Sequence, residues 1–184
     1  MYGEEKGCDI SWLTPGTEIK YSIILKSVHE YGTDVSKFQD TYVIDTIKAD
    51  TIVFKVETSS EHLFWTGHKT RDRYQEIRTY NISGELSFFF IRRHPSVGET
   101  LVDEDGKHWR CIDYPLITNK YLGKRETILL RINTDGMRNM RWYDKQFCIL
   151  LREQMIYVDR YGELHRTWEL ISLRSSALAT KVRY

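Results

Sequence analysis

A short pattern that occurs twice most strongly limits what this chain can fold into. Residues 102–110 and residues 158–166 share Val, Asp, Gly and Arg at the same four of nine positions. In each copy, glycine supplies the positive φ of a tight turn, and the aspartate side chain can bond the turn backbone. Each copy therefore predicts a β-hairpin. The match is short enough to fit either an internal duplication or chance similarity.

Period-two alternation predicts further strands. Ile19, Tyr21, Ile23 and Leu25 alternate with mostly polar residues, which is typical of a half-buried strand over 17–28. The β-branched and aromatic runs 41–47 and 51–58 are separated by three residues, which predicts another hairpin. We also expect strands over 81–91 and 127–132. The first of these has four consecutive apolar residues, so we expect both its faces to be covered.

Two segments favour short helices. Thr58 and Glu61 have the spacing of a capping box, which predicts a helical turn through 63–65 that ends at Gly67. Met140, Tyr143, Phe147 and Leu151 recur every three or four residues, which indicates a short helix over 137–146 leading into a strand. A buried strand over 147–151 is the alternative there. Residues 68–80 fit either a loop or a helix.

These patterns predict a mainly β protein, an antiparallel sandwich or barrel built from hairpins, with one or two short helices. A chain of 184 residues suits one core, and 13% aromatic residues concentrate buried area in few positions. We expect residues 1–184 to form a single mainly β domain. A division into two lobes would fall near 93–98, and the tail 175–184 is expected to be loose.

The cysteines and apolar runs bear on the compartment. No run approaches the ~18 apolar residues of a membrane span, and the N-terminus lacks the pattern of a secretory signal. Cys8, Cys111 and Cys148 are odd in number and widely spaced, so the sequence predicts no disulfide. Cys111 and Cys148 lie in apolar runs typical of buried thiols. We therefore expect a cytoplasmic (intracellular, reducing) location, or one within a virion.

Catalytic and metal-binding patterns are missing from the sequence. There is no G-x-S-x-G nucleophile motif and no glycine-rich phosphate loop. The histidines do not have metal-ligand spacing. His108 and His165 fall one position out of register in the repeated pattern, so that pattern is expected to be structural. We expect no catalytic residue, no metal site and no cofactor, and we favour a non-enzymatic role over an enzymatic one.

One stretch is rich in both basic and aromatic residues. Residues 120–145 contain seven Lys or Arg against three Asp or Glu. Cations that follow phosphates and rings that stack on bases are typical of single-stranded nucleic-acid binders. The candidate residues are Lys124, Arg125, Arg131, Arg138, Arg141, Trp142, Tyr143 and Lys145. The alternative is a solvated face whose aromatic side chains point into the core.

Three functions fit these observations. The first is a non-enzymatic β-rich interaction or assembly protein, such as a structural component of a viral, phage-like particle or another multiprotein complex. Abundant Tyr, Trp and Arg favour it, as do sheet edges that can pair with a neighbour. The second is a single-stranded nucleic-acid-binding barrel that uses 120–145. The third is a small-molecule-binding or hydrolytic β-barrel enzyme. We expect protein partners or self-association, with nucleic acid as the alternative partner, and no membrane.

Overall fold

The computed structural model describes residues 8–179 as an antiparallel β structure with one short helix. Its elements are β1 (Glu18–His29), β2 (Gly32–Ile47), β3 (Thr51–Leu63), β4 (Lys69–Asn81), β5 (Thr100–Val102), β6 (His108–Asp113), β7 (Leu116–Asn119), β8 (Gly123–Thr134), β9 (Met137–Asp144), β10 (Leu150–Asp159), β11 (Gly162–Arg174) and α1 (Ser176–Ala179). The predicted fold class is confirmed.

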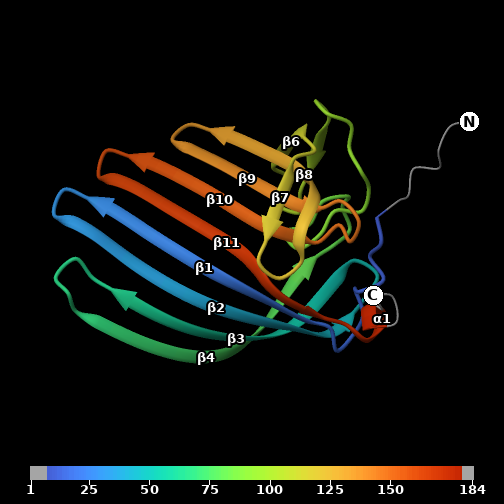
Figure 1. The fold of residues 1–184 in the computed structure, drawn as a ribbon, viewed down its shortest axis with the longest axis horizontal. Coiled ribbons are helices and arrows are strands. Elements are labelled where there is room, and N and C mark those ends of the chain that lie inside the picture. The colour runs from blue at the N-terminus through green and yellow to red at the C-terminus, as the bar shows by residue number, and fades with distance from the viewer. Residues whose placement is uncertain (1–7, 180–184) are drawn as a thin grey trace, which may run out of the picture.

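The described strands form one continuous, open antiparallel sheet. Their order is β4-β3-β2-β1-β11-β10-β9-β8-β6-β5, and β7 pairs separately with β8. The sheet is curved, and four hairpin turns lie together at one end, on the left in Figure 1. Strands β1 and β11, which come from opposite ends of the chain, pair at the middle of the sheet. The free edges belong to β4 and β5.

The two faces of the sheet differ because side chains alternate along each strand. In β1, Ile19, Tyr21 and Ile23 are buried, while Ile24 is 45% exposed. We call the side that carries Ile19, Tyr21 and Ile23 the core face, and the opposite side the outer face. The alternation in 17–28 therefore predicted this strand and its buried face correctly.

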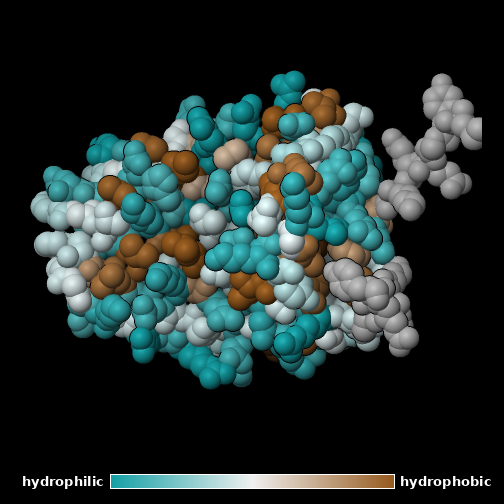
Figure 2. Space-filling view, in the orientation of Figure 1, coloured by the Kyte–Doolittle hydropathy of each residue, from teal (hydrophilic) through white to brown (hydrophobic). Residues whose placement is uncertain are grey.

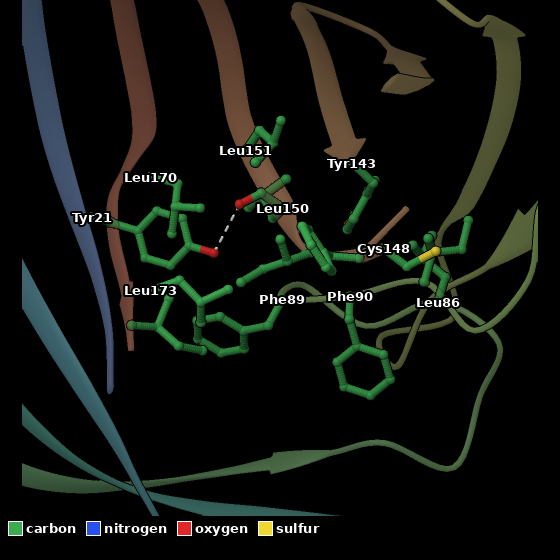
Figure 3. Close-up of a cluster of buried hydrophobic side chains, with 14 of the residues drawn as sticks. Tyr21, Leu86, Phe89, Phe90, Tyr143, Cys148, Leu150, Leu151, Leu170 and Leu173 are labelled. Atoms are coloured by element: carbon green, nitrogen blue, oxygen red, sulfur yellow. Dashed lines mark hydrogen bonds between the residues drawn. The ribbon is translucent and has the colours of Figure 1, made fainter. Parts of the chain in front are cut away.

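The loop between β4 and β5 covers one end of the core face. Figure 3 shows Phe89 and Phe90 of this loop beside buried side chains of the strands. Two tyrosines tie loop and strands together: Tyr21 Oη donates to the Leu150 carbonyl (3.0 Å), and Tyr143 Oη donates to the Ser87 carbonyl (2.9 Å). The strand predicted over 81–91 is wrong, because this apolar run is a loop that folds back through a bridge between Leu86 and Ile91 and makes a second bridge from Phe90 to Ile149.

Neither predicted helix is present: residues 64–67 form the turn between β3 and β4, and residues 137–144 form β9. Thr58 lies inside β3, where its hydroxyl donates to the Asp40 carboxylate (2.8 Å) and caps no helix. The helix predicted over 137–146 from the spacing of Met140 and Tyr143 is also wrong. Tyr143 lies on the core face of β9 and Met140 lies on its outer face. The segment 68–80, predicted to be loop or helix, lies almost entirely in the edge strand β4. In each case, long-range pairing overrides a local pattern.

The two hairpins predicted from the repeat are both present. Asp103 Oδ1 accepts the Asp105 and Lys107 amides after β5, and Asp159 Oδ1 accepts the Tyr161 and Gly162 amides after β10. The shared aspartate therefore closes each turn, which is a structural role. The copies differ in length and surroundings, since β5 and β6 pair over three positions and β10 and β11 over eight.

A disulfide joins the segment before β1 to the turn between β9 and β10. Cys8 and Cys148 are bonded with a Cα–Cα distance of 5.5 Å, and Cys111 is a buried free thiol. The prediction that the chain has no disulfide is therefore wrong. Three cysteines so far apart in sequence gave no spacing from which to infer a pair. No helix within 8–179 is long and apolar enough to cross a membrane.

Candidate functional site

The strands extend well beyond the loop that covers the core face. In Figure 1, no other element of residues 8–179 overlaps the left-hand halves of the long strands. In the same orientation, Figure 2 shows brown hydrophobic patches over the left-hand halves of the central strands. Exposed hydrophobic side chains of this half occur on both faces, with Tyr157 on the core face and Ile24 and Val158 on the outer face.

The strand registers arrange the core face into rows that cross the sheet from β1 to β9. From the covered end outward, the rows are Ile23-Trp168-Glu153-Arg141, Leu25-Arg166-Met155-Asn139 and Ser27-Leu164-Tyr157-Met137. Phe38 of β2 is paired beside Ile23. We name Leu25, Phe38, Met155, Tyr157 and Leu164 the apolar shelf. Four of these side chains are half-buried and Tyr157 is 40% exposed.

Charged residues stand where the covered rows meet the apolar shelf. Glu153 is fully buried and accepts three hydrogen bonds. Asn139 Nδ2 and Arg141 Nε donate to its Oε1 at 3.0 and 3.1 Å, and Arg166 Nη2 donates to its Oε2 at 3.0 Å. One carboxylate thus holds two guanidinium groups from the strands on either side of β10. Such a network fixes the side chains that surround it.

Aromatic rings enclose this charged group. The Arg141 guanidinium carbon lies 4.1 Å from the centre of the Trp109 ring and 4.9 Å from that of Phe88. The Phe88 ring also lies 4.9 Å from the Trp168 ring. The Phe88 amide in turn donates to Glu104 Oε1 (3.1 Å). Phe88 of the covering loop therefore bridges the indole of Trp168 and the cation of Arg141.

Unpartnered buried polar atoms gather at the same place. Within 8–179, seven buried side-chain nitrogen or oxygen atoms have no hydrogen-bond partner. Five of them are Glu104 Oε2, Asn139 Oδ1, Arg141 Nη1, Arg166 Nε and Trp168 Nε1, and a sixth is Ser87 Oγ, next to Phe88. We call Glu104, Asn139, Arg141, Glu153, Arg166 and Trp168 the polar niche. Buried polar groups are normally paired, so such a concentration is a feature to explain.

Burial shapes the ionisation of the polar niche. It raises the pKa of the Glu104 carboxyl above its ordinary value. Burial by itself would lower the pKa of Arg141, but Tyr143 and Glu153 more than offset this, so the pKa is raised and the guanidinium stays charged. Two cations therefore face two carboxyl groups, and the niche carries no excess positive charge.

A second polar cluster on the core face has its hydrogen bonds in place. The buried Asp40 accepts the hydroxyls of Tyr42 (3.0 Å) and Thr58 (2.8 Å). Arg78 Nη1 of β4 donates to the Tyr42 hydroxyl (3.0 Å). None of these groups is among the unpartnered atoms found in the described chain. This cluster fits a structural role, which sets the polar niche apart.

A hollow of about 470 Å³ lies among strands β1 to β4, lined mainly by outer-face side chains. Its carboxylates are each committed to a neighbouring cation: Glu18 to Lys20, Glu57 to Arg73 and Glu76 to Arg78. The hollow therefore presents largely compensated surface charge. Its one buried atom without a hydrogen bond in the described chain is Glu18 Oε1, which lies 3.3 Å from Lys20 Nζ.

The sequence predicted no metal site, but the structure brings three possible metal-ligating residues together. Cys8, Cys148 and His94 place their ligand atoms within 4.8 Å of one another. The two sulfurs are bonded to each other, and His94 Nε2 lies 2.8 Å from the Lys145 carbonyl oxygen. These groups are thus committed to the disulfide and to the turn they support.

The structure separates the basic and aromatic residues that the sequence grouped together. Arg141 and Tyr143 are buried on the core face, whereas Arg131, Arg138 and Trp142 belong to the outer face. Arg125 pairs with the buried Asp144 (2.6 Å), Lys145 pairs with Glu126 (2.8 Å), and Lys124 is exposed on β8. The eight candidates therefore do not share one face. Arg141 alone among them belongs to the polar niche.

Sequence reasoning missed the other charged members of the niche. Glu153 lies between Leu151 and Met155 at alternate positions of β10, and Arg166 lies between Leu164 and Trp168 on β11. A charged residue inside an apolar alternation was the signal that could have found both. It is informative because a charge on a buried face needs a partner.

Comparisons with known proteins give distant structural likeness. No protein-family model and no curated protein matches the chain. A protein from Bacteroides fragilis, described as exported and with a YmcC-like fold, has 9% identity and a TM-score of 0.42, over 88% of this chain and 97% of that one. A protein from Parabacteroides distasonis, described as a lipoprotein, has 12% identity and a TM-score of 0.40, over 91% and 99%. An outer-membrane lipoprotein-sorting domain from Vibrio parahaemolyticus has 9% identity and a TM-score of 0.28, over 91% and 87%.

These findings correct the function and location predicted from the sequence. None of these three similar structures is described as a phage-like particle component or as an intracellular protein; they are described as an exported protein, a lipoprotein and an outer-membrane lipoprotein-sorting domain. The Cys8–Cys148 disulfide also contradicts a reducing compartment. The nucleic-acid-binding alternative is wrong, because its basic residues are divided between two faces. The third alternative was a small-molecule-binding or hydrolytic enzyme built on a β-barrel, and the described strands form an open sheet instead.

Proposed function

We propose that this protein is an extracytoplasmic carrier that binds the hydrocarbon chain of an amphipathic ligand on the apolar shelf. The observation that carries the proposal is the boundary between the shelf and the polar niche. An uncovered apolar surface there ends at buried polar groups that lack partners. Ligand sites characteristically combine apolar walls with a few polar groups that set orientation.

The shape of the surface fits a chain better than a compact ligand. The apolar shelf crosses neighbouring strands from Phe38 to Tyr157, in the half that no other element of residues 8–179 overlaps in Figure 1. A chain laid across these strands would cover side chains that now face water. Burying apolar surface contributes about 25 cal/mol per Å², or roughly 0.8 kcal/mol for each CH₂ group.

The extracytoplasmic part of the proposal depends on the disulfide. Disulfides persist in oxidising compartments and are rare in the cytosol. The Cys8–Cys148 bond closes a sequence separation of 140 residues, so it constrains nearly the whole described chain. We also propose that residues 1–184 act as a single domain, which agrees with hydrogen bonding that continues across the sheet from β4 to β5.

Paired substitutions on opposite faces of β1 test chain binding. Leu25 belongs to the apolar shelf, and its neighbour Ile24 is 45% exposed on the outer face. We expect Leu25→Asp to weaken binding of a fluorescent acyl probe by about tenfold or more, because a carboxylate would have to be desolvated under the chain. Ile24→Asp should leave binding within about twofold of the wild type, since its side chain lies on the other face.

Circular dichroism and urea unfolding would confirm that both variants are folded. Phe38→Ala provides a second shelf variant without an added charge. Equal probe binding by wild type, Leu25→Asp and Phe38→Ala would overturn the proposal. Analytical ultracentrifugation tests the expected protein partners or self-association by measuring the oligomeric state. If the wild type binds no probe and forms a dimer that Leu25→Asp dissociates, a second copy of the chain covers the apolar shelf instead of a ligand.

A further inference from the structure

We propose that the polar niche selects an uncharged headgroup, so that the ligand is an acyl ester or amide rather than a free fatty acid or an amine. This inference rests on the proposed function and specifies the chemistry of the ligand's polar end. It follows from three properties of the niche: its hydrogen-bonding inventory, its charge balance and its position beside the apolar shelf.

The inventory contains both donors and acceptors. Arg141 Nη1, Arg166 Nε and Trp168 Nε1 can only donate, whereas Asn139 Oδ1 and a Glu104 carboxylate oxygen accept. A carbonyl oxygen in the ligand would receive the donors. A hydroxyl or amide N–H beside that carbonyl would use the acceptors. Esters with free hydroxyls and primary amides supply both kinds of group on neighbouring atoms.

The charge balance disfavours a charged headgroup. Arg141 and Arg166 both bond to Glu153, and the Glu104 carboxyl lies close enough to Arg141 to interact with it electrostatically. Asp103 is committed elsewhere, because it accepts the Trp109 indole N–H (2.7 Å) and the turn amides of Asp105 and Lys107. An anion would therefore meet no excess positive charge. A cation would face the donors of two guanidinium groups.

The depth of the niche makes this selection strong. Glu153 has no exposed surface, and the Arg141 side chain is only 10% exposed. Removing an ion from water into such a place is costly unless a counter-charge is available, whereas a neutral carbonyl needs only hydrogen bonds. Because Trp168, Arg166 and Met155 are half-buried at the edge of the niche, the headgroup can enter from the shelf.

Four ligands with the same C18 monounsaturated chain test the inference: 1-monooleoylglycerol, oleamide, oleate and oleylamine. Each would be titrated into the full-length protein below its aggregation concentration, and its dissociation constant measured by displacement of the fluorescent acyl probe. We expect the glycerol ester and the amide to bind about tenfold or more tightly than the carboxylate and the amine, which corresponds to about 1.4 kcal/mol. Tightest binding of oleate or oleylamine would overturn the inference.

Replacing Trp168 tests the niche directly. Trp168→Phe keeps an aromatic ring but removes the unpartnered N–H, so the preference for neutral headgroups should fall at least threefold. Trp142→Phe is the matched control, because Trp142 is a half-buried tryptophan on the outer face of the same sheet. An unchanged preference in Trp168→Phe would also overturn the inference. If all four ligands bind equally, headgroup selection fails and chain binding stands; if none binds, the proposed function itself fails.

Discussion

Glu153→Gln is the substitution that most directly tests the polar niche as a structural unit. The Glu153 carboxylate is fully buried and neutralises Arg141, which is 10% exposed, and Arg166, which is 33% exposed. Glutamine keeps the shape but removes the charge and places an N–H₂ group near one guanidinium. Removing one partner of a buried ion pair typically costs about 3–5 kcal/mol, because the other charge stays buried without compensation. We expect a loss at the lower end, about 3 kcal/mol, since Arg166 can turn toward water.

Urea unfolding followed by circular dichroism measures this loss from the shift of the midpoint at constant m-value. Glu169→Gln is the matched control: Glu169 pairs with Arg152 at 3.3 Å, and both side chains are about a quarter exposed. That pair should contribute no more than about 1 kcal/mol. The double substitution Glu153→Met plus Arg141→Met should recover much of the lost stability, because an apolar pair can replace a buried ion pair. Equal costs for Glu153→Gln and Glu169→Gln would refute the reasoning.

Three further predictions follow from the fold. Reducing the Cys8–Cys148 bond should lower the free energy of unfolding by about 5 kcal/mol, because the bond closes a sequence separation of 140 residues and limits the entropy of the unfolded chain. Thiol titration of the denatured protein should find one thiol before reduction and three after it. Three thiols before reduction would contradict the disulfide. Gly162→Ala should lower the free energy of unfolding by more than about 3 kcal/mol, because a Cβ there would lie 2.0 Å from the Val28 carbonyl oxygen. Gly106→Ala is the control: its Cβ meets open space, so it should cost only about 1 kcal/mol of backbone strain. Similar melting temperatures for the two variants would argue against the contact with Val28. Because burial raises the pKa of Glu104, the folded state binds its proton more tightly than the unfolded state, and this contribution to stability is lost as pH rises through the folded pKa. Glu104→Gln should therefore gain stability relative to the wild type as pH rises from about 4.5 to 7. Urea midpoints of the two proteins that show no such trend would contradict the raised pKa.

The candidate site could be predicted from the sequence only in fragments. Arg141 was recognised as a candidate residue, but for a surface that binds phosphates. Its burial depends on Glu153, which lies on the next strand of the sheet. Glu153 and Arg166 each interrupt an apolar alternation, so the sequence marks both as unusual. The identity of their partners depends on strand register, which a period-two pattern does not specify.

The sequence by itself determined the local elements of this protein. Alternation along 17–28 and the aspartate–glycine turns after Val102 and Val158 specify strands and hairpins, because these signals act over a few residues. The tertiary structure alone decided the pairing of β1 with β11, the Cys8–Cys148 bond and the fate of the apolar run 86–91. The physical reason is distance along the chain: such contacts form only when the whole sheet assembles. The same assembly places two guanidinium groups around one buried carboxylate beside an uncovered apolar surface.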